Sequence, residues 1–226
     1  MIPYYLLLSH DFNPKNITTL SSNSQLGIDA ISDNTPYSSI RKSPSKGIQG
    51  FAEYDLVTET LKRQKGRAYG NSDIFNNFIL IKEDVLYYNK TNNLLILSTS
   101  KENFHHFIKR FDKNDSFTFQ TIPVDFPAII ENALNLGTDC VWLGELENTN
   151  INAVGLMGHK VQASTEYQQY INTGAVITNI SFIYDYKGTQ EKIMISRDGG
   201  IILYHSKPRK DALDLILDVY KKMLLP

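Results

Sequence analysis

The chain has 226 residues, of which 42% are hydrophobic and 11% aromatic, and its net charge at pH 7 is −1. A chain of this length can bury a sizeable core, so we expect one domain over residues 1–226, or two lobes at 1–115 and 116–226. The balanced charge excludes a global basic field, and the hydrophobic content excludes a disordered chain.

Cys140 is the only cysteine, which excludes an internal disulfide and a cysteine-based zinc site. The apolar run at 2–8 lacks the charged start of a signal peptide, and no stretch approaches the roughly 20 apolar residues of a membrane helix. The sequence therefore predicts a cytoplasmic protein that has no membrane segment and no cofactor.

The first third of the chain predicts few regular elements. We expect a strand at 2–8, a loop at 13–25, a short strand at 27–32 and a second loop at 33–50. Tyr54, Val57 and Leu61 have helical spacing, which predicts a short helix over 51–64, followed by a loop at 66–71.

From residue 74 onward the patterns are stronger. Apolar runs at 78–81, 85–88 and 94–97, with a turn at 89–93 between the last two, predict strands and a hairpin. Ser100 is placed to cap a helix over 101–111, a strand is expected at 117–124, and Asp125 opens a helix that Gly137 ends. Paired strands are expected at 141–146 and 151–156, and a short helix at 164–172.

The last fifty residues predict a three-stranded meander at 175–186, 192–196 and 201–205, followed by an amphipathic helix that begins at Pro208. Segment 75–111 has the same order of strands and helix. Either a βββα unit is duplicated, or two junctions between a strand and an amphipathic helix agree by coincidence. The predicted fold class is α+β, with a mainly antiparallel sheet and helices packed on one face.

Most motifs that announce a chemistry are absent. The sequence has no G-x-x-x-x-G-K-[ST] phosphate loop, no G-x-G-x-x-G after a strand, no H-E-x-x-H and no G-x-S-x-G. Glu191 and Lys192 follow Asp185, but neighbours on a strand face opposite sides of a sheet, so they do not form a nuclease motif. We therefore lean against an enzyme, while a dispersed active site stays open.

One segment comes close to a catalytic pattern. His205, Lys207 and Asp211 resemble the H-x-K-x-x-x-x-D pattern of phospholipase-D-type phosphodiesterases, with one residue fewer between Lys207 and Asp211. The resemblance implies a nucleophilic histidine and a lysine that holds phosphate oxygens. The alternative is a solvated turn that leads into a helix.

The histidines do not predict a metal site. His105 and His106 are adjacent on the predicted helix, so their rings point about 100° apart and cannot bind one ion from that helix alone. His10 and His159 are isolated in the sequence.

Basic residues are concentrated between positions 41 and 67, a segment that contains seven Lys or Arg and only three Asp or Glu. Tyr37, Tyr54 and Tyr69 lie among them in Ser-, Gly- and Pro-rich sequence, and such a segment suits contact with a phosphate backbone. The alternative is an ordinary solvated surface. The predicted nucleic-acid-binding residues are Arg41, Lys42, Lys46, Lys62, Arg63, Lys65 and Arg67.

Three functions follow. The first is a non-enzymatic binding protein that contacts nucleic acid or a partner protein; the Lys- and Asn-rich composition suggests an AT-rich genome and a role in phage–host conflict, as a defence accessory or an inhibitor. The second is a phosphodiesterase or nuclease with a dispersed His/Lys/Asp site. The third is an oligomeric module in which the edge of the 175–205 meander pairs with another chain.

Overall fold

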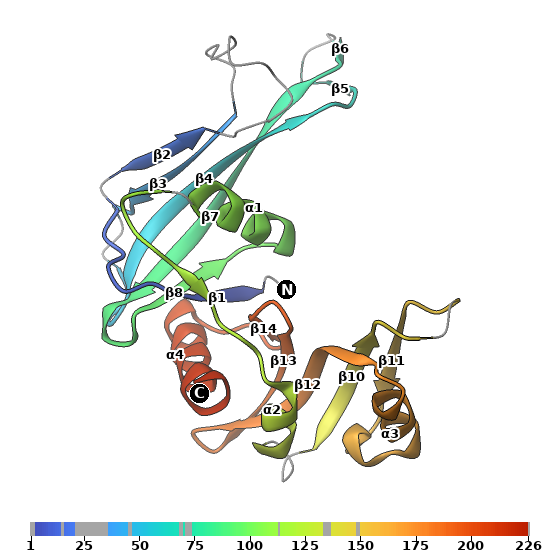
Figure 1. The fold of residues 1–226 in the computed structure, drawn as a ribbon. Helices are drawn as coiled ribbons and strands as arrows, with labels where there is room; N and C mark the ends of the chain where they lie inside the picture. The colour runs from blue at the N-terminus through green and yellow to red at the C-terminus, as the bar shows by residue number, and fades with distance from the viewer. Residues whose placement is uncertain are drawn as a thin grey trace. The chain divides into compact units, whose positions relative to one another are not determined.

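The computed structural model describes residues 3–14, 16–20, 36–44, 47–67, 70, 74–112, 114–132, 137–147 and 150–225. They form two compact units (Figure 1). We call Leu8–Gln120 the ribbon unit, and Met1–Leu7 together with Thr121–Pro226 the meander unit. All recorded strand pairs within the two units are antiparallel, which confirms the predicted α+β class with an antiparallel sheet.

The sheet of the ribbon unit has the order β8-β7-β4-β3-β2. A two-residue hairpin, β5–β6, lies beyond the ends of β4 and β7 (Figure 1). The elements of this unit are β2 (Ile17–Leu20), β3 (Tyr37–Lys42), β4 (Ala52–Lys62), β5 (Gly66–Arg67), β6 (Ile74–Phe75), β7 (Phe78–Asn89), the 3₁₀ turn η1 (Lys90–Asn92), β8 (Leu94–Ser98) and α1 (Lys101–Phe111).

Helix α1 begins where the sequence predicts, because the Ser100 hydroxyl accepts a hydrogen bond from the Asn103 backbone N–H. Its buried face, Phe104, Phe107 and Phe111, belongs to the same core as Leu56 of β4 and Leu86 of β7. The predicted hairpin turn at 89–93 is also confirmed, since Asn93 adopts the left-handed conformation that asparagine tolerates, with φ 51°.

The sheet of the meander unit has the order β11-β10-β12-β13-β14-β1. Alternate residues of β13 such as Ile193 and Ile195 are fully buried, and α4 supplies Leu213 and Ile216 to the core. The strands are β1 (Tyr4–Leu8), β9 (Gln120–Thr121), β10 (Thr138–Gly144), β11 (Ala153–Met157), β12 (Val176–Tyr186), β13 (Thr189–Ser196) and β14 (Gly200–Leu203).

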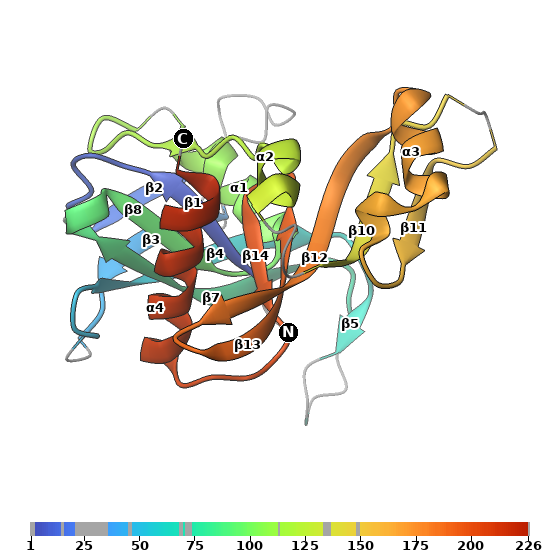
Figure 2. The same cartoon turned by 90° about the horizontal axis from the view of Figure 1, so that it is seen from below.

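The helical segments of the meander unit are α2 (Phe126–Asn132), the 3₁₀ turn η2 (Val161–Ala163), α3 (Thr165–Asn172), α4 (Arg209–Val219) and the π-helical turn η3 (Tyr220–Leu224). Figure 2 shows α3 beside β10 and β11. Among the described residues, no helix has the length and apolar character needed to cross a membrane. The predicted meander and terminal helix are confirmed, as are the paired strands near 141–146 and 151–156.

Four predictions for the first third of the chain are wrong. The predicted loops at 13–25, 33–50 and 66–71 contain β2, β3 and β5, and the predicted helix at 51–64 is strand β4. β4 lies inside the sheet, between β3 and β7. Neighbouring residues of β4, which point to opposite faces, are both buried at 53–54 and at 58–59, so the strand lacks a clean alternation. The predicted strand at 27–32 lies outside the described residues.

Two further predictions change in detail. The runs at 78–81 and 85–88 are one strand, β7, and the strand expected at 117–124 has only two residues, β9. A βββα order still occurs in both units: β4, β7, β8 and α1 in the first, and β12, β13, β14 and α4 in the second.

Most of the outer edge of the 175–205 meander is occupied within the chain, because β10 pairs with β12 as far as Phe182 and β1 pairs with β14. Pairing of this edge with another chain stays a prediction.

Candidate functional site

A two-stranded ribbon projects from the ribbon unit (Figure 1). β3 pairs with β4 only as far as Thr58, and β8 pairs with β7 only from Val85 onward. Beyond these points β4 and β7 pair only with each other, from Glu59 opposite Ile81 to Lys62 opposite Phe78. We call residues 59–82 the ribbon arm; hairpin β5–β6 lies within it.

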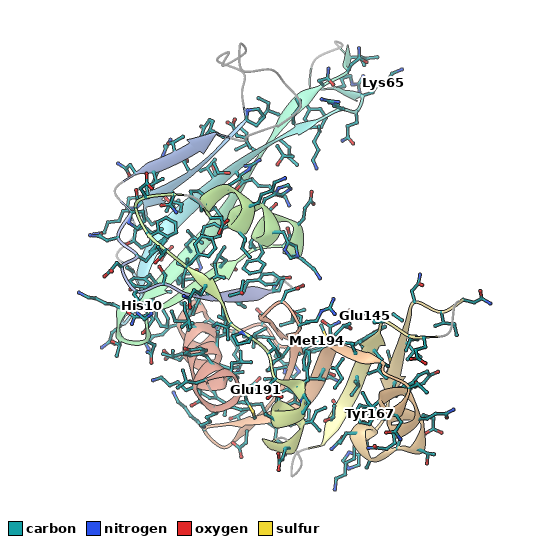
Figure 3. The ribbon with its side chains drawn as sticks, in the orientation of Figure 1. His10, Lys65, Glu145, Tyr167, Glu191 and Met194 are labelled. Atoms are coloured by element: carbon teal, nitrogen blue, oxygen red, sulfur yellow. The ribbon has the colours of Figure 1, made fainter. Side chains whose placement is uncertain are left out.

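The ribbon arm is strongly basic. Between residues 59 and 82 the sequence has five Lys or Arg and two acidic residues, Glu59 and Asp73. Lys62 Nζ lies 3.7 Å from Glu102 Oε1 on α1. Arg63, Lys65 and Arg67 are exposed, and no described residue pairs with their charges. Figure 3 shows Lys65 at the tip of the arm. These three cations are therefore available to an anionic partner.

Large apolar side chains are exposed on the same arm. Ile74 is 68% exposed, Ile81 57% and Leu80 36%. Three exposed apolar side chains on a narrow ribbon lower the solubility of the protein unless a partner covers them. Exposed apolar groups of this kind often mark a binding surface.

Arg110 of α1 holds the base of the arm. Its guanidinium donates hydrogen bonds to the Ser38 hydroxyl on β3 and, at 2.8 Å, to the Glu59 carbonyl on β4. Burial lowers the pKa of this guanidinium, and the Glu59 carboxylate acts in the opposite direction. Asn103 adds a 2.7 Å hydrogen bond to Asp84 Oδ2 on β7. α1 thus links three strands at the point where the arm leaves the sheet.

His106, one turn before Arg110, does not gather with other ligands. Burial is the main cause that lowers the pKa of its imidazole, followed by the positive charge of Arg110, while Glu102 raises it. Its Nε2 lies 3.8 Å from Glu102 Oε1. Within the described ranges, no group of three His, Cys, Asp or Glu residues has a geometry that could hold a metal ion.

The structure divides the predicted nucleic-acid-binding residues into two groups. Arg41 and Lys42 end β3, and Lys42 lies opposite Tyr54 near the start of β4. Lys62 lies eight residues further along β4, or about 26 Å at the rise of a strand. Lys62, Arg63, Lys65 and Arg67 share the arm, whereas Lys46 lies outside the described residues. The interleaved Tyr54 is 5% exposed, so its ring is not free to stack on a base.

The motif that resembles a phosphodiesterase is occupied by an internal ion pair. Lys207 Nζ lies 2.5 Å from Glu191 Oε1, and His205 Nδ1 lies 3.7 Å from Glu191 Oε2 (Glu191 is labelled in Figure 3). The Glu191 side chain is only 6% exposed. Asp211 is exposed in the first turn of α4, where its charge acts on Lys187. Lys207 is thus committed to a buried carboxylate rather than free to hold phosphate.

Local sequence patterns predict neither the ion pair of Glu191 nor the hydrogen bonds of Arg110. Each finds its partners through the tertiary fold: Glu191 and Lys207 are 16 residues apart, and Arg110 and Glu59 are 51 residues apart. A local pattern carries no signal of such pairs.

A comparison with known protein families finds no match to the sequence, and a search of curated proteins finds none either.

Proposed function

We propose that this protein binds double-stranded nucleic acid through the ribbon arm. The observation that carries the proposal is that Arg63, Lys65 and Arg67 form no ion pair with any described residue, on a two-stranded ribbon that leaves the body of its unit. Cations that neutralise phosphates release condensed counterions, and this release drives most non-specific binding to nucleic acid.

The shape of the arm supports a duplex as the ligand. The major groove of B-DNA is about 12 Å wide and admits a two-stranded ribbon. Exposed isoleucines such as Ile74 and Ile81 are of the type that ribbon proteins place against sugars or between base steps.

The test is the salt dependence of binding to a 25-base-pair duplex, measured by fluorescence anisotropy. The triple variant Arg63→Ala/Lys65→Ala/Arg67→Ala removes about three phosphate contacts. It should lower affinity by about tenfold or more at 0.1 M salt and reduce the slope of log K against log salt by about 2 to 3.

The chain offers a matched control in the other half of the basic segment. Arg41→Ala/Lys42→Ala also removes strand-end cations, but at the far end of β4. This variant should bind the duplex like the unchanged protein. Equal losses in both variants, or a complex insensitive to salt, would reject the arm as the binding element.

A further inference from the structure

A pocket of about 580 Å³ lies in the ribbon unit at the start of β4, at the opposite end of that strand from the arm. Its lining includes three nearly buried aromatic residues, Phe12, Tyr54 and Tyr88, and three polar residues, His10, Asp11 and Lys90. Figure 3 labels His10 at this end of the unit. The volume lies within the range of about 300–1,000 Å³ that is usual for small-molecule sites.

The walls of this pocket are fixed by hydrogen bonds from β7 and the turn that follows it. The Tyr88 hydroxyl lies 3.1 Å from the Ser9 carbonyl and 3.2 Å from the His10 carbonyl. Asn89 Nδ2 donates at 3.0 Å to the Gly50 carbonyl on the other side. The Ser9 backbone N–H also donates at 2.8 Å to the Asn93 carbonyl. A pocket built this way needs little ordering when a ligand binds.

Tyr54 is a buried residue whose hydroxyl reaches solvent and is not used by any described residue. The residue is 5% exposed, and its ring meets Phe12 edge-on with 5.1 Å between centroids. Among the described residues, none forms a hydrogen bond with this hydroxyl, and its oxygen is not sealed from solvent. Burial, and then the neighbouring Tyr88, raises the pKa of Tyr54, so the hydroxyl remains a donor. A donor that the described residues leave unused, and that solvent reaches at a pocket wall, is available to an acceptor on a ligand.

The polar residues of the pocket favour an anion. Lys90 is exposed and has no ion pair within the described residues. Lys42, opposite Tyr54 in the β3–β4 register, is also exposed and unpaired there. His10 Nδ1 lies 3.1 Å from Asn93 Nδ2. Asp11 is the single acidic residue among those lining the pocket.

We propose that this pocket binds a small molecule that combines a planar ring with an anionic group, as a nucleoside monophosphate does. The ring accepts a hydrogen bond from the Tyr54 hydroxyl, while Lys90 and His10 hold the anionic group. The site is independent of the ribbon arm, so either proposal can fail alone.

The experiment uses the full chain with AMP, GMP, CMP and UMP, the four matching nucleosides, and inorganic phosphate as probes. Binding is measured by saturation-transfer NMR and calorimetry. At least one monophosphate should bind with a Kd of about 1 mM or tighter, and its nucleoside and phosphate alone should bind about tenfold more weakly. Absence of binding by all four monophosphates, or equal binding of phosphate alone, would overturn the proposal.

Two variants separate the ring contact from the anion contact. Tyr54→Phe should raise the Kd about 3- to 10-fold for both the monophosphate and its nucleoside, because it removes one hydrogen bond and keeps the ring. Lys90→Gln should weaken only the monophosphate. Lys221→Gln, an exposed lysine on η3, is the control that should change neither.

Thermal unfolding checks the premise without any ligand. Because the Tyr54 hydroxyl has no partner among the described residues, Tyr54→Phe should leave the midpoint unchanged or raise it slightly. A clear loss of stability would mean that the hydroxyl is used within the protein, and the proposal would then lose its basis.

Discussion

Tyr184 on β12 and Asp218 on α4 show how single polar groups join helix to sheet in the meander unit. The Tyr184 hydroxyl donates a 2.5 Å hydrogen bond to Asp218 Oδ2, which also accepts one from Lys222 Nζ at 2.9 Å. Burial alone would raise the pKa of Asp218, but the hydrogen bonds from Tyr184 and Lys222 outweigh burial and lower it. Burial of Tyr184, followed by its hydrogen bond to Asp218, raises the pKa of the Tyr184 hydroxyl.

The sign of the pH dependence follows from this lowered pKa. A carboxyl whose pKa is lower in the folded state contributes stability at neutral pH and loses that contribution as the pH falls through the folded-state pKa. Tyr184→Phe should therefore cost about 1–2 kcal/mol of unfolding free energy at pH 7, and less once the pH falls below about 4.

Urea unfolding of the unchanged protein and of Tyr184→Phe, between pH 3 and pH 7, measures the difference in their unfolding free energies. Tyr170→Phe, a partly buried tyrosine whose hydroxyl forms no hydrogen bond with the described residues, is the control and should cost little at any pH. A pH-independent difference for Tyr184→Phe would contradict the assigned pairing.

Residue types were readable from the sequence, but residue partners were not. His205 and Lys207 stand out locally because a strand end is followed by charged residues. Lys207 pairs with Glu191, a carboxylate on a neighbouring strand that needs a cation because it is buried. Such a need becomes visible only when the strands are placed side by side.

At the scale of elements, strand β4 explains why the first third was misread. Tyr54, Val57 and Leu61 have helical spacing, yet Tyr54 and Leu56 lie on one face of a strand whose other face also holds a buried residue, Glu53. Strand β7 was misread for a different reason. Its charged residues Lys82, Glu83 and Asp84 interrupt the apolar pattern, so one strand looked like two apolar runs. Capped helices and tight hairpins were predictable because their signals are local.

The arm's attachment can be tested through Arg110. Arg110→Met keeps most of the side-chain bulk and leaves the Glu59 carbonyl and the Ser38 hydroxyl without this donor, which should cost about 1–3 kcal/mol. Hydrogen exchange of the amides at 59–62 and 78–81 should accelerate. Duplex affinity should fall a few-fold with an unchanged salt slope, since Arg110 positions the arm and contacts no phosphate.

Lys109→Met is the matched control, because it removes the same charge from an exposed neighbouring position on α1. If Lys109→Met accelerates exchange in the arm as much as Arg110→Met does, the loss of a positive charge, and not the loss of the Arg110 hydrogen bonds, would explain the faster exchange.

At the scale of the whole molecule, the chain alternates between its two units. The first strand, β1, pairs with β14, where Tyr4 lies opposite Ile201 and Tyr5 opposite Gly200. The sequence predicts both strands, but nothing local predicts that they pair across almost 200 residues. The repeated βββα order is predictable because the apolar face of each helix is visible in the sequence. The position of β1 is not predictable in this way, because β1 pairs with β14, the last strand of the meander.

Gly200 is the point at which this long-range pairing can be tested. A Cβ at Gly200 would lie 2.8 Å from Tyr5 Cε1 and 2.8 Å from Ser196 Oγ. Gly200→Ala should therefore force Tyr5 away from β14 and lower the unfolding free energy by about 1–3 kcal/mol. Trp142, the only tryptophan, lies on β10 of the same unit, so its fluorescence during urea unfolding reports the loss.

The control for this measurement is Gly158→Ala, whose Cβ would meet only Val161 Cγ2 at an ordinary 3.8 Å. The urea midpoint should fall for Gly200→Ala with an unchanged slope, and stay in place for Gly158→Ala. Equal midpoints would mean that Tyr5 does not pack on Gly200 in solution. A lower midpoint would show that β1 helps to hold together a sheet made mostly from the second half of the chain.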